Sequence, residues 1–134
     1  PHAAFAVYQA MCSPTLEVLA TRVVHLAGDT HRVEIGIANT GWLPTEITRR
    51  ARKDNLVLPL VAELTGATVL TPGGARQELG QLAGRSAMQP SYGKNDGTPD
   101  RVLATWIVSA NAGTQVTVNV SHQRAGRCSA TVSL

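Results

Sequence analysis

The stretch that decides the fold is Val116-Thr117-Val118-Asn119-Val120-Ser121, in which valine alternates strictly with a polar residue. Successive side chains of a β-strand point to opposite faces, so this pattern predicts a strand with one buried and one solvated face. Residues 111–113 (Asn-Ala-Gly) before it and 124–126 (Arg-Ala-Gly) after it are typical of turns. The alternation returns in residues 128–134, where it directs Cys128 toward the core.

Segments closer to the N-terminus have the same period of two. Residues 33–37 predict a clean half-buried strand, and residues 16–26 predict a first strand that bends near Arg22. Residues 102–108 are apolar at nearly every position, so we expect a central strand that is buried on both faces.

Shorter strands are expected between these segments, over residues 56–64, 67–70 and 76–82. Pro59 favours an edge position or a bulge for its strand, and Gly80 is a candidate bulge. Seven or eight strands with regular turns and no long helix predict an all-β fold, an antiparallel immunoglobulin-like β-sandwich.

The N-terminal segment has a different pattern. Its apolar residues Phe5, Tyr8 and Met11 are three apart, which predicts a short helix that ends at Ser13-Pro14. We expect residues 1–13 to be the tail of an upstream domain or a linker helix, and residues 14–134 to be the sandwich domain. A helical turn is also expected within residues 46–53.

Composition limits the functional classes. A chain of 134 residues is the usual size of one domain. The net charge of +3 is too small to indicate a nucleic-acid partner, and no apolar run approaches the roughly 20 residues of a membrane span. Cys12 and Cys128 lie near opposite ends of the sequence, and both a disulfide and two free thiols fit that spacing.

One short motif has the sequence spacing of a zinc site. His31-Arg32-Val33-Glu34 has the His-x-x-Glu spacing of two zinc ligands, and His122 lies downstream as a third. Residues three apart on a strand point to opposite faces, so His31 and Glu34 are not expected to meet at one ion. We interpret them as exposed polar residues at a strand end. No nucleophile elbow or phosphate loop is present, so we expect no catalytic, metal or cofactor site in this chain.

Candidate binding residues lie in the expected helical turn and in two loops. The basic run within residues 49–53 is either a solvated face or a contact for an acidic partner, such as an anionic cell-wall polymer. Trp106 belongs to the expected core, whereas Trp42 either caps the core or stacks on a ligand. The long polar loop 84–100 contains an aromatic residue that we expect to be an exposed contact. The candidate partner-binding residues are therefore Arg49, Arg50, Arg52, Lys53, Trp42 and Tyr92.

Five strings in order carry a resemblance to a known family. They are Ser13-Pro14-Thr15-Leu16-Glu17-Val18, Asn39-Thr40-Gly41-Trp42-Leu43-Pro44-Thr45, Glu78-Leu79-Gly80-Gln81-Leu82-Ala83-Gly84-Arg85-Ser86, Asn111-Ala112-Gly113-Thr114 and Ser121-His122-Gln123-Arg124-Ala125-Gly126. Together they resemble the C-terminal β-sandwich of bacterial zinc carboxypeptidases of the carboxypeptidase A class. The second string is also similar to cell-adhesion-related, immunoglobulin-like modules.

The resemblance implies an extracytoplasmic, bacterial, multidomain parent metallopeptidase, a hydrolase whose zinc lies only in its catalytic domain. The chain would then be a non-catalytic accessory domain that braces or positions the upstream peptidase domain. The alternative is an autonomous module that binds cell-surface glycan or peptidoglycan. A third interpretation is an adhesin-like assembly module that uses an exposed edge strand.

Overall fold

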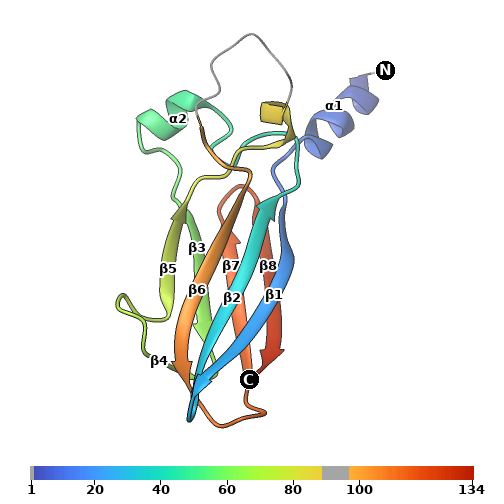
Figure 1. Cartoon of the computed structure of the whole chain (residues 1–134). Helices are drawn as coiled ribbons and strands as arrows, with labels where there is room; N and C mark the ends of the chain where they lie inside the picture. Colours follow the sequence, from blue (N-terminus) through green and yellow to red (C-terminus); the bar gives the residue numbers. More distant parts are fainter. Residues whose placement is uncertain (1, 89–96) are drawn as a thin grey trace.

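The computed structural model describes residues 2–88 and 97–134. Two four-stranded antiparallel sheets pack face to face, which confirms the predicted all-β sandwich with a short N-terminal helix (Figure 1). Sheet A has the order β1-β2-β6-β4, and sheet B has the order β5-β3-β7-β8. The strands are β1 Leu16–Ala27, β2 Thr30–Asn39, β3 Leu60–Thr65, β4 Thr68–Val69, β5 Arg76–Gly80, β6 Arg101–Ser109, β7 Gln115–His122 and β8 Gly126–Ser133.

The core lies between the two sheets and follows the predicted alternation. Every second residue of β2 from Val33 to Ile37 is fully buried, as are the three alternating valines of β7. Trp106 of β6 is also fully buried, and its indole Nε1 donates a hydrogen bond to the carbonyl oxygen of Ala75 at 3.0 Å. The indole therefore fills the core without leaving its only donor unpaired.

Strand β6 is buried on one face only, so the prediction of burial on both faces is wrong. Ala104, Trp106 and Val108 point inward, but Leu103 on the opposite face is 60% exposed. Within residues 2–88 and 97–134 no helix packs over this outer face of sheet A. An apolar run therefore does not by itself distinguish a strand covered on both faces from one covered on a single face.

Pro59 does not mark an edge strand, contrary to one of the two expectations for it. Strand β3 begins one residue later, at Leu60, and lies between β5 and β7. The missing amide hydrogen of Pro59 thus costs no ladder hydrogen bond. The expected bulge at Gly80 is present, because Leu60 pairs with Gly80 but Val61 pairs with Glu78, and Gly80 has a φ of 76°.

The first strand is long and irregular. It pairs with β2 as a hairpin, but its register shifts between Val18 and Ala20 and again between His25 and Ala27. The first shift exposes Ala20, which the simple alternation would have directed inward. A bulge changes the face that each following residue occupies.

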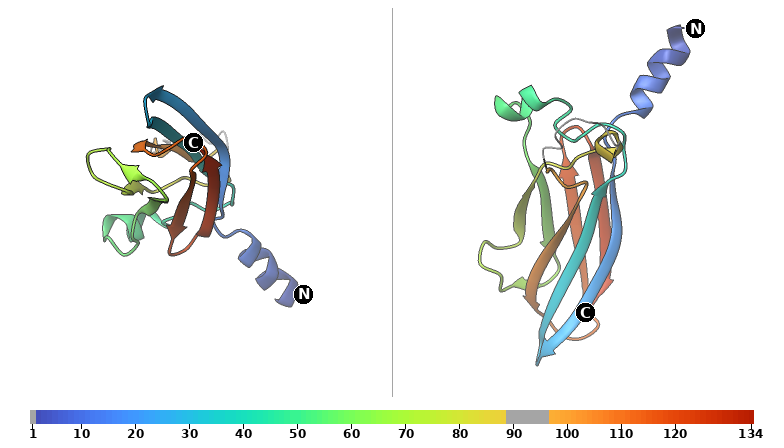
Figure 2. Two further views of the ribbon diagram at one scale, coloured as in Figure 1. Left: turned by 90° about the horizontal axis from the view of Figure 1, so that it is seen from below. Right: turned by 45° about the horizontal axis from the view of Figure 1, so that its top comes forward.

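The helical segments gather at one end of the sandwich, which we call the upper end as it is drawn in Figure 1. They are α1 His2–Met11, α2 Arg49–Lys53 and the short 3-10 helix η1 Arg85–Met88. Helix α1 projects away from both sheets (Figure 2), and none of its residues is buried.

Candidate functional site

The upper end of the sandwich carries an apolar helix without a packing partner in the described chain. In α1 the side chains of Phe5, Val7, Tyr8 and Met11 are all at least half exposed, from 59% for Val7 to 77% for Met11. The helix contains no Asp, Glu, Lys or Arg. Isolated soluble domains rarely expose such a group of large apolar side chains, and an exposed apolar group of this kind usually marks an interaction site.

The chain is held firmly where α1 meets the sandwich. The amide of Leu43 donates to the carbonyl oxygen of Cys12 at 3.0 Å, and the amide of Thr40 donates to the carbonyl oxygen of Thr15 at 2.9 Å. Gly41 lies so close to this segment that a β-carbon on it would be 2.3 Å from the carbonyl oxygen of Ser13. The point at which α1 leaves the sandwich is therefore fixed by backbone packing.

One buried amide side chain joins three segments at this junction. Asn39 is 2% exposed; its Oδ1 accepts hydrogen bonds from the amides of Thr15 at 3.0 Å and Gly41 at 3.1 Å. Its Nδ2 donates to the carbonyl oxygens of Leu43 at 2.8 Å and Ala83 at 3.2 Å. We call these residues the Asn39 cluster. All four hydrogen-bonding positions of the amide are used, so the cluster is structural.

A second buried polar group, the His122 cluster, joins the same end of sheet B to the loop that precedes β3. The Nδ1 atom of His122 accepts from the amides of Arg124 at 3.1 Å and Ala125 at 3.2 Å. The ring proton is therefore on Nε2, which lies 3.1 Å from Oε1 of Gln81. The Gln81 amide nitrogen in turn donates to the carbonyl oxygen of Leu58 at 3.0 Å.

The surroundings of His122 favour the neutral ring. Burial lowers the pKa of His122, a hydrogen bond with the Leu58 backbone opposes that change, and the charge of Arg124 lowers the pKa further. A neutral imidazole with two occupied nitrogens is not free to act as a general base.

The two clusters contain residues from four of the five sequence strings. Segments of the first three strings meet at the Asn39 cluster, and the fifth contains His122. These four strings therefore contribute to the packing of the upper end, whereas the Asn111-Ala112-Gly113-Thr114 string lies between β6 and β7. The role of Asn39 could not be predicted from the sequence, because its hydrogen-bonding partners lie as far away in the sequence as Ala83.

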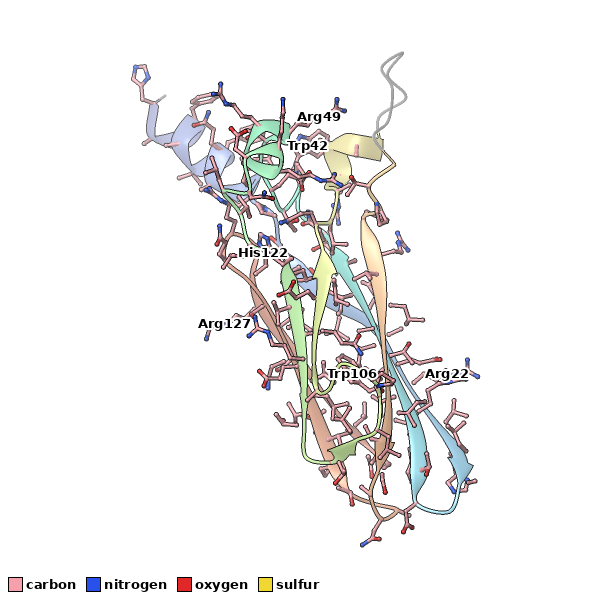
Figure 3. The ribbon with its side chains drawn as sticks, turned by 90° about the vertical axis from the view of Figure 1, so that its left-hand side faces the viewer. Arg22, Trp42, Arg49, Trp106, His122 and Arg127 are labelled. Carbon is pink, nitrogen blue, oxygen red and sulfur yellow. The ribbon has the colours of Figure 1, made fainter. Side chains whose placement is uncertain are left out.

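The basic run lies on α2 at the upper end, where Figure 3 labels Arg49 and Trp42. Arg50 pairs with Asp54 at 3.3 Å, and Nη1 of Arg52 donates to the hydroxyl of Thr98 at 2.7 Å. Trp42 is 42% exposed, so it does not close the core completely. The run is therefore exposed but partly engaged with its own chain. The predicted contact Tyr92 lies outside the described residues.

A polar hollow lies on the outer face of sheet B, on the side of Arg127 and below His122 in Figure 3. Its volume is about 350 Å³ and it is open to solvent. Four charged side chains line it, and none of them makes a hydrogen bond or ion pair within residues 2–88 and 97–134. These are Glu63, Glu78, Arg76 and Arg127, with Asn119 and Ser121 between them.

The hollow is therefore lined by charges of both signs together with the Asn119 amide and the Ser121 hydroxyl. Such a surface suits a polar ligand that itself carries both carboxylate and amine groups, since each free charge has a counterpart to recognise. Sequence reasoning missed this region because its residues come from four strands.

The side chains of the apparent zinc motif do not converge on a common metal position. His31 is 4% exposed and points into the core, whereas Glu34 points outward and pairs with Arg32 at 3.0 Å. The expectation that His31 is exposed is thus wrong, although the predicted separation of the two faces holds. His122 ends β7, at the other end of the molecule from the start of β2. Within the described ranges no group of three or more His, Cys, Asp or Glu side chains is placed to hold a metal ion.

Comparison with known proteins identifies the domain. Residues 15–133 match a family described as domain of unknown function DUF8731. No curated protein matches the sequence. Among the described helices, none has the length and apolar character needed to cross a membrane. The family match covers almost the whole sandwich, so the chain belongs to the DUF8731 family.

Proposed function

We propose that this chain is a non-catalytic accessory domain that docks through α1 onto the zinc carboxypeptidase domain preceding it in a bacterial, extracytoplasmic parent protein. The observation that carries the proposal is the exposure of the apolar side chains of α1. The resemblance of the five strings to carboxypeptidase C-terminal domains supplies the identity of the partner.

Helix α1 is too short to be stable alone. Isolated helices below roughly 12–15 residues are marginal in water, and most helices in proteins depend on burying an apolar face. Helix α1 has ten residues and buries none of them against the sandwich. A neighbouring domain that covers Phe5, Tyr8 and Met11 would supply the missing burial.

Because the junction is anchored, docking of α1 would also fix the position of the sandwich. Because Cys12 and Thr15 are hydrogen-bonded to the Thr40–Leu43 loop, a partner that binds α1 also fixes the upper end of the sandwich nearby. The α2 basic run and Trp42 lie at the same end. The domain would then brace the peptidase and border the access to its cleft, and would contribute no reactive group.

Hydrogen exchange tests this proposal directly. The amides of α1 should exchange rapidly in the isolated chain and at least about tenfold more slowly in the parent protein, whereas amides of β2 and β7 should be equally protected in both. Equal exchange of α1 in the two proteins would overturn the docking. A parent without a zinc carboxypeptidase domain upstream would overturn the identity of the partner.

A second candidate function, binding of cell-surface glycan or peptidoglycan, is favoured by the hollow on sheet B. Peptidoglycan stem peptides carry both carboxylates and amines, which matches the free charges of Glu63, Glu78, Arg76 and Arg127. Retention on purified cell wall should fall in Arg127→Glu and persist in Arg22→Glu, whose charge lies on the outer face of sheet A. An Arg49/Arg50/Arg52 triple alanine variant tests the basic run separately. Absence of retention by the unaltered chain rules out this function.

A further inference from the structure

The lower tip of the β1–β2 hairpin, opposite the upper end in Figure 1, brings two histidines together. His25 of β1 and His31 of β2 are direct partners in the antiparallel register, so their side chains lie on the same face. Their ring centroids are 5.2 Å apart, with an interplanar angle of 64°. Two other histidines of the chain, His2 and His122, lie at the upper end.

His31 is buried without a hydrogen bond. It is 4% exposed, and neither Nδ1 nor Nε2 has a partner within the described chain. The equally buried His122 has partners for both nitrogens. A buried polar group without a partner is unusual in a folded protein, and a bound ion is one of its recognised explanations. The unpaired nitrogens of His31 therefore point to a partner from outside the chain.

His25 is already oriented in the way that metal-binding histidines are. Its Nε2 lies 2.8 Å from the carbonyl oxygen of Gly28. A carbonyl oxygen only accepts, so the proton is on Nε2 and Nδ1 carries the free lone pair. Metal-ligating histidines usually donate their second N–H to such a carbonyl, which fixes the ring and its tautomer.

The separation of the rings fits one shared ion. Metal–nitrogen bonds of about 2.0–2.1 Å in tetrahedral geometry place the centres of two imidazole rings about 5 Å apart, and the two rings here are 5.2 Å apart. Strand β1 is the edge of sheet A and His25 is exposed, so an ion reaches the pair from solvent.

We propose that His25 and His31 form a binding site for a divalent transition-metal ion such as Ni²⁺, Cu²⁺ or Zn²⁺. Imidazole nitrogens favour these ions over Mg²⁺ and Ca²⁺, which prefer oxygen ligands. The remaining coordination positions face solvent at the hairpin edge and are open to water or to a ligand from another molecule. The site is separate from the upper end and does not depend on the proposed docking.

Calorimetric titration of the chain with Ni²⁺ tests the proposal. We expect one ion per chain, and an affinity about tenfold or more weaker in His25→Gln, whose exposed position leaves the core intact. His2→Gln is the matched control, because His2 is an exposed histidine on α1, and it should retain the affinity. Mg²⁺ should not bind at the same concentrations. Unchanged affinity in His25→Gln, or loss of binding in His2→Gln, overturns the site.

A spectroscopic readout tests the role of His31 without altering the core. Substoichiometric Ni²⁺ is paramagnetic and should broaden the ring resonances of both His25 and His31 before those of His122. The ion should also raise the melting temperature of the unaltered chain but not of His25→Gln, because a ligand that binds only the folded state stabilises it. Broadening of His25 without His31 overturns the pairing.

Discussion

Gly41 and Ser13 approach each other so closely that a β-carbon on Gly41 would lie 2.3 Å from the Ser13 carbonyl oxygen. The two nearest further atoms are also backbone, from Pro14 and Thr15, so no side chain can move aside to relieve the contact. This contact makes glycine a requirement of the junction between α1 and the sandwich.

The variant Gly41→Ala should therefore lower the free energy of unfolding by at least about 2 kcal/mol, because the backbone of residues 13–15 must shift. Urea denaturation measures the change. Gly36→Ala is the matched control: the nearest atom to its new β-carbon would be the Ala20 β-carbon at 3.6 Å, an ordinary contact, and its effect should stay within about 0.5 kcal/mol. Equal effects of the two variants would contradict the steric requirement at Gly41.

Asn39→Ala should destabilise the chain by about 3 kcal/mol, because it leaves the amides of Thr15 and Gly41 without the acceptor that they share. The same denaturation experiment measures it. Asn111→Ala, in the exposed turn before β7, is the control and should change stability by less than about 0.5 kcal/mol. A small effect at Asn39 would mean that water replaces the side chain.

The His122 cluster predicts a specific pH dependence. Burial lowers the pKa of His122 below its ordinary value of 6.5, so the unfolded chain takes up a proton more readily than the folded chain. The stability that depends on neutral His122 is fully present above pH 6.5 and is lost as the pH falls through the lower folded pKa. The unaltered chain should therefore be more stable than His122→Gln at neutral pH, and this difference in the free energy of unfolding should decrease as the pH falls. Denaturation curves between about pH 5 and 7.5 measure it; a constant difference would show that burial of His122 does not cause the pH dependence.

Substitutions in α1 should leave the sandwich unaffected. Tyr8 is 63% exposed, so Tyr8→Ser should change the unfolding free energy of the isolated chain by less than about 0.5 kcal/mol. Leu64, which is 2% exposed, provides the contrast, and Leu64→Ala should cost about 2–5 kcal/mol. A cost for Tyr8→Ser comparable with that for Leu64→Ala would show that α1 packs on the sandwich in solution.

The pattern of strands could be predicted where one face of a strand is buried and its other face is exposed to solvent. Strand β7 and residues 33–37 of β2 follow the alternation of their sequences, because each strand lies inside a sheet with one covered face. Strand β6 departs from its predicted burial, since Leu103 is exposed on a face that nothing in the described chain covers. Strand β1 departs from the alternation at the register shift after Val18, which depends on pairing with β2 and leaves no local signal.

The candidate sites were less predictable because they join distant segments. The basic run and Trp42 were identified from local sequence, and both are exposed at the upper end. The Asn39 cluster depends on loops that are distant in the sequence, and the sheet B hollow and the His25–His31 pair depend on strand register. Burial of His31 was missed for a related reason: a histidine beside a turn favours an exposed interpretation, whereas its register partner Val108 lies in the core.

The two ends of the described chain lie at opposite ends of the sandwich (Figure 1). Strands β1 and β8 start together, since the amide of Leu16 donates to the carbonyl oxygen of Ala125 at 3.2 Å, and both then run toward the lower end. A force that pulls α1 and Leu134 apart therefore acts along the strands and shears the long β1–β2 ladder. The hydrogen bonds of this ladder must then break together and not one after another.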